Sequence, residues 1–383
     1  MEYDIQYKDF REEVRAYCED KIAPFAVEID RDQFFSKEVH QLIQDRGWWG
    51  CITPKEFGGL ALPTVQYAII VEEVSRVCGS TGLTLAAHNS LGTFPINAFC
   101  NDEIRKKFLT DAATKGSLIA FGLTEPEAGS DAGGTKSKAV NKGDHYIING
   151  TKCWITSANV CDYAIMTART SDEGGVHGIS SFAIEKGMDG FTAGKKENKL
   201  GVRGSDTAYL HMDDLKVPAS HLMGKEGEGF KQFMITLDGG RISIGALGVG
   251  LAQAALELAV KYSESKMING RPISGNQWVQ FKLADMAMQV EAARLIMYKT
   301  CWLKDNGHKY TRLSAMCKLY ASEAAHFCTD GAITILSEDG VLEKYPAERY
   351  WRDMKLCEIG EGTSEVQRIV IAREAIKELS DKI

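Results

Sequence analysis

The sequence predicts an α+β protein with an N-terminal helical domain (residues 1–118), a middle β-domain (119–228) and a C-terminal helical bundle (229–383). Three observations predict this order. Apolar residues recur at helical spacing in the first third, short β-rich segments fill the middle, and long amphipathic segments fill the remainder. A chain of 383 residues also exceeds what a single hydrophobic core usually holds.

The first third is expected to be a series of helices. Its apolar residues recur every three or four positions, which places them on one helix face. The small residues of 80–90 predict a buried helix that its neighbours approach closely, whereas the proline and paired glycines of 53–59 predict a loop. The expected helices are 4–22, 37–46, 65–77, 80–90 and 102–109.

The middle third is expected to be a sandwich- or barrel-like β-domain. Turn residues such as Lys142-Gly143-Asp144 and Asn149-Gly150 separate its β-rich segments. The expected strands are 118–123, 145–148, 164–168, 181–184, 191–193 and 208–212.

The last third is expected to be an antiparallel helical bundle, because its amphipathic segments are long and the breaks between them are short. The expected helices are 245–267, 277–306, 311–337 and a last helix that follows Gly362 and ends near residue 379.

Composition narrows the functional classes. A net charge of −7 disfavours a nucleic-acid-binding protein. The chain has no run of about 18 apolar residues, and its acidic start, Met1-Glu2-Tyr3-Asp4, lacks the apolar region of a signal peptide. Ten scattered cysteines without a CxxC pair disfavour zinc and iron–sulfur sites. We therefore expect a cytoplasmic protein without a membrane span or a metal.

The most informative stretch surrounds Glu361, which stands between Gly360 and Gly362. Ser364 and Gln367 have the spacing of a capping box, so a helix is expected to begin there. The flanking glycines allow unusual backbone angles and a close approach of a ligand to the main chain. Taken alone, Glu361 is more simply interpreted as an acid that complements the helix dipole.

Two hydroxyl-rich segments follow predicted strands. Leu123-Thr124 opens the loop that contains Ser130, and such loops offer N–H groups and hydroxyls to a polar ligand. Trp154 stands beside Thr156, and a tryptophan next to hydroxyls can pack on a flat ring while the hydroxyls bind its edge. A polar connection and a core tryptophan are the ordinary alternatives.

A fourth stretch, Leu237-Asp238-Gly239-Gly240-Arg241, is expected to open a long helix. Arg241 could hold a phosphate or a carbonyl there. A surface salt bridge is the alternative.

Together these segments resemble the acyl-CoA dehydrogenase family, and the resemblance covers nearly the whole chain. The matching residues are Leu123-Thr124-Glu125-Pro126-Glu127-Ala128-Gly129-Ser130-Asp131, Trp154-Ile155-Thr156, and Glu361-Gly362-Thr363 before Gln367. The resemblance, which includes short- and branched-chain members, implies a four-helix bundle at the C-terminus, an FAD cofactor and usually a homotetramer.

The resemblance also implies a reaction. Glu361 would remove the α-proton of an acyl-CoA thioester while flavin N5 takes the β-hydride, which gives a trans-2-enoyl-CoA. Electrons would pass to an electron-transferring flavoprotein. Some relatives carry the base at the position of Gly240, which has no side chain to act as one.

Further roles are carried over from the family by position. Leu123 and Thr124 would bind the pyrimidine edge of the flavin, and Thr156 would lie near N5 with Trp154 beside the ring. The remaining assignments are Thr363 and Gln367 to the cofactor, Ser130 to the cofactor phosphates or CoA, and Asp238, Arg241 and Gly362 to the substrate.

Departures from the family pattern generate two expectations. Lys266, Asn269, Ser337 and Glu338 replace an Arg, a Phe and two glycines in segments that hold the FAD tail of a neighbouring subunit, so we expect weaker or rearranged binding of that tail. Gly360 replaces a common Tyr, which predicts room for a branched, cyclic or aromatic acyl group.

Alternatives at this point are a relative of the same fold with other chemistry, namely an enoyl-CoA reductase, a decarboxylating dehydrogenase or a non-redox lyase. A non-enzymatic binding protein built on the same scaffold is a further one.

Overall fold

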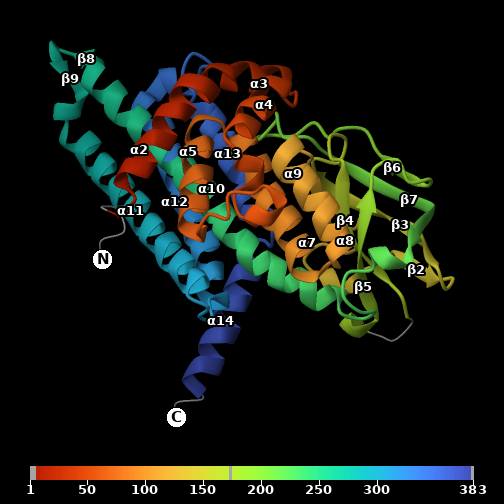
Figure 1. The fold of residues 1–383 in the computed structure, drawn as a ribbon. Coiled ribbons are helices and arrows are strands. Elements are labelled where there is room, and N and C mark those ends of the chain that lie inside the picture. The colour runs from red at the N-terminus through yellow and green to blue at the C-terminus, as the bar shows by residue number, and fades with distance from the viewer. Residues whose placement is uncertain (1–5, 172–174, 381–383) are drawn as a thin grey trace.

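The computed structural model describes residues 6–171 and 175–380 and shows helices, a curled sheet and a helical bundle in the predicted order (Figure 1). The N-terminal helices lie against both the sheet and the bundle. They are α2 (Lys8–Tyr17), α3 (Ala26–Asp32), α4 (Lys37–Asp45), α5 (Thr64–Val77), α6 (Gly79–Ala87), α7 (Phe94–Phe99), α8 (Asp102–Ile104) and α9 (Thr110–Lys115), with a π-helical turn η5 (His88–Thr93) between α6 and α7.

Close packing explains the small residues of α6. A Cβ built on Gly82 would lie 2.0 Å from Ser75 Oγ of α5, so only glycine lets the two helices approach this closely. The predicted buried helix is therefore confirmed, and it continues into η5.

The sheet has seven strands in the order β1-β4-β2-β3-β7-β6, and β5 pairs with β4. β1 and β4 run parallel, whereas β4 and β5 run antiparallel. The strands are β1 (Ile119–Gly122), β2 (Lys138–Asn141), β3 (His145–Thr156), β4 (Tyr163–Arg169), β5 (Ile179–Glu185), β6 (Phe191–Ala193) and β7 (Thr207–Pro218).

One predicted turn was wrong. Asn149-Gly150 lies inside β3, which extends to Thr156 instead of ending at Ile148. The pairing of β3 with β7 shifts register between Ile148 and Gly150 and again between Lys152 and Ile155. Gly150 therefore serves a bulge, which bends a long strand without ending it.

The C-terminal bundle forms around α10 (Gly229–Ser265) with α11 (Gln277–Asp305), α12 (Thr311–Leu336), α13 (Ala347–Ile359) and α14 (Ser364–Ser380). A short hairpin, β8 (Met267–Ile268) and β9 (Arg271–Pro272), joins α10 to α11. Within the described residues α10 alone is long and apolar enough to cross a membrane, and 78% of its most apolar window is buried in the protein. Its apolarity therefore belongs to the core.

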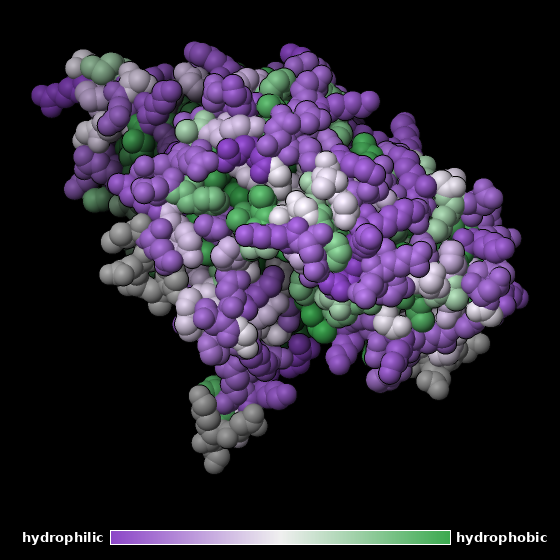
Figure 2. All heavy atoms as spheres, in the orientation of Figure 1, coloured by the Kyte–Doolittle hydropathy of each residue, from purple (hydrophilic) through white to green (hydrophobic). Residues whose placement is uncertain are grey.

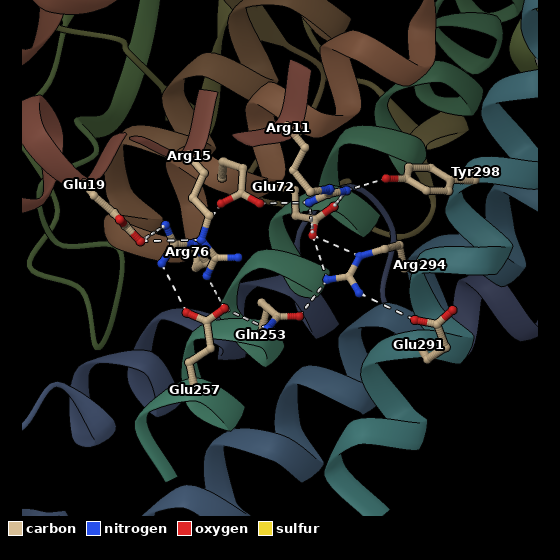
Figure 3. A network of polar contacts seen from close by, with 11 residues as sticks. Arg11, Arg15, Glu19, Glu72, Arg76, Gln253, Glu257, Glu291, Arg294 and Tyr298 are labelled. Atoms are coloured by element: carbon tan, nitrogen blue, oxygen red, sulfur yellow. Dashed lines mark hydrogen bonds and ion pairs between the residues drawn. The ribbon is translucent and has the colours of Figure 1, made fainter. Parts of the chain in front are cut away.

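A buried polar network ties the N-terminal helices to the bundle (Figure 3). Arg11 of α2 donates to Glu72 of α5 at 2.7 Å, and Arg294 of α11 donates to the same carboxylate at 2.9 Å. Burial alone would raise the pKa of Glu72, but the charges and hydrogen bonds of Arg11 and Arg294 outweigh it and lower the pKa to about 2.

Candidate active site

The predicted base lies on a tight turn between α13 and α14. Glu361 and Gly362 both have positive φ, 54° and 92°, which for glutamate is an uncommon backbone conformation. Gln367 of α14 donates to the carbonyl oxygens of both residues, at 3.2 and 2.9 Å. The turn is therefore fixed from the helix that follows it.

The predicted helix start is confirmed at Ser364, but the predicted capping box was wrong. The hydroxyl of Thr363 accepts the N–H of Val366 at 3.3 Å, so Thr363 is the N-cap. The Gln367 side chain is occupied with the two carbonyls of the turn and does not reach back to the cap.

Gly240 provides the space that Glu361 occupies. Asp238–Arg241 lies inside α10, not at its start as the sequence predicted, because the apolar face of that helix extends back to Gly229. A Cβ on Gly240 would lie 2.3 Å from Glu361 Oε2 and 2.7 Å from Leu91 Cδ2. A side chain at position 240 would therefore displace the carboxylate from this place.

The Glu361 carboxylate is unpaired, and one of its two oxygens is buried. The residue as a whole is half-buried, but Oε2 is buried and has no hydrogen-bond partner in the described part of the chain. Burial raises the pKa of Glu361 to about 7, against the opposing charges of Lys318 and Arg241.

Asp238 and Arg241 form a pair one turn apart on α10. Arg241 donates to Asp238 at 2.5 Å, and Thr311 at the start of α12 donates to the other carboxylate oxygen at 2.7 Å. Arg241 is buried, and its Nε has no partner among the described residues. This open guanidinium N–H beside Glu361 can donate a hydrogen bond to a ligand.

Leu123, Thr124, Trp154 and Thr156, four of the predicted cofactor-binding residues, meet at one end of the sheet, whereas Thr363 and Gln367 lie at the Glu361 turn. The Cys153 N–H donates to the Thr124 carbonyl at 2.9 Å, which joins the loop after β1 to the end of β3. The side chain of Trp154 is 59% exposed at a positive φ of 60°, next to the second register shift of β3. The bulge thus turns this indole outward.

Several donors here have no partner in the part of the chain that the structure describes. They are the backbone N–H of Thr124 and the hydroxyls of Thr124 and Thr156. Open donors beside an exposed indole fit a flat ring with a polar edge, as a flavin has. When bound, a flavin supplies a hydride acceptor, and Leu123, Thr124, Trp154 and Thr156 would hold it.

α10 connects two clusters of predicted site residues: one around the Glu361 turn, and one around Thr124 and Trp154 at the end of the sheet. Phe233 of α10 stacks on Phe121 of β1 with ring centroids 4.3 Å apart, and Gly240 lies seven residues further along the same helix. At 1.5 Å per residue that separation is about 10 Å. Ser130 is exposed on the loop after β1, and no contact in the described structure joins it to either cluster.

Sequence reasoning missed two buried lysines. Lys152 donates to the Leu123 carbonyl at 3.2 Å and to Glu125 at 2.7 Å, so it holds the loop after β1. Lys318 of α12 donates to the Gly362 carbonyl at 2.7 Å, beneath the Glu361 turn. Lys318 could have been found from the sequence, because it stands among small residues of α12, such as Ala315 and Ala321, that are buried.

The segments that depart from the family pattern meet at one end of the bundle. Lys266 lies 3.4 Å from Glu338 and 3.3 Å from Asp339, and Tyr262 donates to Asp339 at 2.7 Å. Ser337 has φ 55° and Asn269 has φ 51°. Lys266 is thus already paired with carboxylates.

Comparison with known proteins identifies the family. The N-terminal, middle and C-terminal domain models of acyl-CoA dehydrogenase match residues 6–116, 120–215 and 227–376. The chain is 46% identical over 368 residues to a probable acyl-CoA dehydrogenase, YngJ, of Bacillus subtilis, which covers 96% of this chain and 97% of that protein.

Two solved structures superpose on nearly the whole chain. Butyryl-CoA dehydrogenase from Megasphaera elsdenii has a TM-score of 0.94 at 39% identity, over 96% of this chain and 97% of that one. A chain from a structure of the electron-transferring flavoprotein of Acidaminococcus fermentans has the same TM-score at 42% identity, with the same coverage. The chain therefore belongs to the acyl-CoA dehydrogenase family and is a flavin-dependent oxidoreductase that acts on acyl-CoA.

Proposed function

We propose that Glu361 is the base that removes the α-proton of the acyl-CoA, and that FAD is the flavin that accepts the β-hydride. The observation that carries this proposal is the dry, unpaired Oε2 of Glu361 against Gly240. A carboxylate with a pKa of about 7 is well matched to proton abstraction near neutral pH.

The turn also offers a donor for the substrate. The backbone N–H of Glu361 makes no hydrogen bond among the described residues. Directed at the thioester oxygen, this N–H would stabilise the enolate charge that develops as the proton leaves. The buried surroundings strengthen such a bond because water does not compete for it.

The remaining contacts are proposed from position. Thr363 and Gln367 would contact the cofactor, and Gly362, Asp238 and Arg241 the substrate. Ser130, exposed and unattached to either cluster, would serve the cofactor phosphates or CoA only at the outer end of the site.

We further propose that the acyl group is short and straight, as the butyryl-CoA dehydrogenase relative supports. A branched acyl group is the second candidate, and Gly360 favours it. The atoms nearest to a Cβ built there belong to Leu356, at an ordinary 3.4 Å, so close contact does not require glycine at this position.

An electron-transferring flavoprotein is the proposed electron acceptor, supported by the structure with which the chain superposes. A homotetramer in the cytoplasm is the proposed assembly and location. The ten free cysteines, nine of them buried, suit a reducing compartment.

The first experiment is an absorption spectrum of the purified protein during anaerobic titration with butyryl-CoA and isobutyryl-CoA. We expect the flavin band to bleach, at lower concentrations of the preferred thioester. Glu361→Gln should retain the flavin band but bleach about 10²- to 10⁴-fold more slowly, because the amide cannot accept the proton. Glu365→Gln, an exposed acid on the first turn of α14, is the matched control. Normal bleaching in Glu361→Gln would refute the assignment of the base.

A further inference from the structure

Lys318 is buried beneath the Glu361 turn and has few hydrogen-bond partners. Its side chain is fully buried in α12, and the Gly362 carbonyl, at 2.7 Å, is its one hydrogen-bond acceptor among the described residues. An ammonium group has three donors. Burial of a charge with so few partners is costly unless an opposite charge balances it.

The opposite charge that balances Lys318 must come from one of its charged or titratable neighbours. They are Arg241 of α10, Cys357 and Glu358 of α13, Glu361 of the turn and Glu365 of α14.

Each acid other than Glu361 is excluded for its own reason. Glu358 is paired with Lys355 at 2.5 Å and with His326 at 2.8 Å. Burial raises the pKa of Cys357 to about 12, so this thiol is neutral. Glu365 is exposed to solvent. Glu361 is therefore the buried carboxylate that Lys318 balances.

The other charged and titratable groups around Glu361 do not replace Lys318. Arg241 is already bonded to Asp238 at 2.5 Å, and both belong to α10. Tyr67 of α5 donates to the Ala86 carbonyl at 2.8 Å, and burial raises its pKa far above neutral, so the phenol carries no charge. The unpaired cation and the unpaired carboxylate of this site are thus neighbours.

We propose that Lys318 is a positioning residue for the dehydrogenation: it holds the Glu361–Gly362 turn through the Gly362 carbonyl and balances the charge of the Glu361 carboxylate in a dry site. This inference rests on the proposed role of Glu361 as the base. Lys318 transfers no proton in it.

The electrostatics of the turn agree with this geometry. Burial raises the pKa of Glu361, and Lys318 is the foremost of the two cations that oppose the rise. Burial lowers the pKa of Lys318 itself to about 8, so it is largely protonated at neutral pH. Removal of the Lys318 charge therefore leaves Glu361 harder to ionise.

The test is the pH dependence of kcat/KM with butyryl-CoA in the flavin-loaded enzyme. We expect Lys318→Met and Lys318→Gln to move the acid limb upward by about one pH unit, because an opposite charge nearby shifts a carboxyl pKa by that order. Below the limb this means about a tenfold loss of kcat/KM. Two neutral variants are made so that the test can still be carried out if one of them does not fold.

Lys304→Met is the matched control for the loss of a poorly paired lysine. Its ammonium lies 3.4 Å from a Cβ built on Gly239, on a different face of α10, and it is not among the groups that act on Glu361. Its acid limb should stay in place.

An unchanged acid limb in a folded Lys318 variant overturns the proposal, even if activity falls at every pH. Glu361→Gln measured in the same assay separates the two claims. If that variant stays active, the base is wrongly assigned; if it is inactive and the limb does not move, only the role of Lys318 fails.

Discussion

At the scale of single residues, the site depends on a glycine that faces an acid. Gly240 and Glu361 are far apart in the sequence, yet a Cβ on Gly240 would overlap the Glu361 carboxylate oxygen at 2.3 Å. The neighbouring Gly239 is less constrained, since a Cβ there would meet only Lys304 Nζ at 3.4 Å. Two adjacent glycines of α10 thus differ in how much space a side chain would have.

Gly240→Ala should lower kcat at least tenfold, because the added methyl group displaces the base from its place against α10. Gly239→Ala is the control. Both replacements favour the helix by up to about 1 kcal/mol, so neither should unfold it. Steady-state kinetics with thermal unfolding of both variants makes the comparison, and equal kcat values would contradict the proposed fit of Glu361.

At the scale of elements, the Arg11–Glu72–Arg294 network joins α2, α5 and α11 (Figure 3). Arg11→Met should lower the free energy of unfolding by about 3 kcal/mol, because it leaves the buried Glu72 short of a partner. Denaturant unfolding measures this. Arg31→Met, which loses only an exposed pair with Asp32, should unfold as wild type; an equal loss in both would contradict the importance of burial.

The same network predicts the acid sensitivity of the fold. The pKa of Glu72 is about 2 in the folded protein, below its ordinary value of 4.5. Its stabilisation is therefore complete above pH 4.5 and is lost as the pH falls from 4.5 toward 2. Arg11→Met should show a weaker loss of stability across this window than wild type.

A second pair of elements, the end of α10 and the segment after α12, is proposed to contact the FAD tail, as the family resemblance implies. Lys266 is engaged by Glu338 and Asp339, and Ser337 occupies a conformation that favours glycine. Glu338→Gly should tighten FAD binding several-fold, as measured by fluorescence quenching of the apoprotein. Glu343→Gln, in the same segment, is the control, and an unchanged Kd in Glu338→Gly would refute the expected repulsion.

At the scale of the whole molecule, apolar side chains remain on the surface of the bundle. The face seen in Figure 2 is largely hydrophilic, with apolar side chains gathered near its middle. α11 carries a row of exposed apolar residues spaced three or seven positions apart, and α14, which projects from the body in Figure 1, carries another. The exposed residues are Trp278, Phe281, Met288, Leu295 and Trp302 on α11 and Ile369, Ile376 and Leu379 on α14.

Such rows are typical of helices that pack against other subunits. Phe281→Lys should therefore shift the molar mass from the proposed tetramer toward smaller species, as measured by light scattering after size-exclusion chromatography. Gln280→Lys, exposed but off the row, should leave the mass unchanged. A wild-type monomer would contradict the proposed assembly.

The sequence by itself determined the order of helices, strands and helices, because the periods of apolar residues are local properties of the chain. It also determined the family, through the motifs around Thr124, Trp154 and Glu361. The prediction was wrong at two places where glycine was interpreted as a local break. Asn149-Gly150 forms a bulge within β3, and Gly239-Gly240 lies inside α10, where Gly240 makes a close contact with Glu361.

Only the tertiary structure decided what surrounds the base. Local patterns do not show that Gly240 makes room for Glu361, that Lys318 lies beneath its turn, or that Lys266 is paired with Glu338. Each is a contact between distant segments, fixed by the packing of α10 against α12 and the turn before α14. The pKa of Glu361 depends on that packing, because burial and neighbouring charges exist only once the chain is folded.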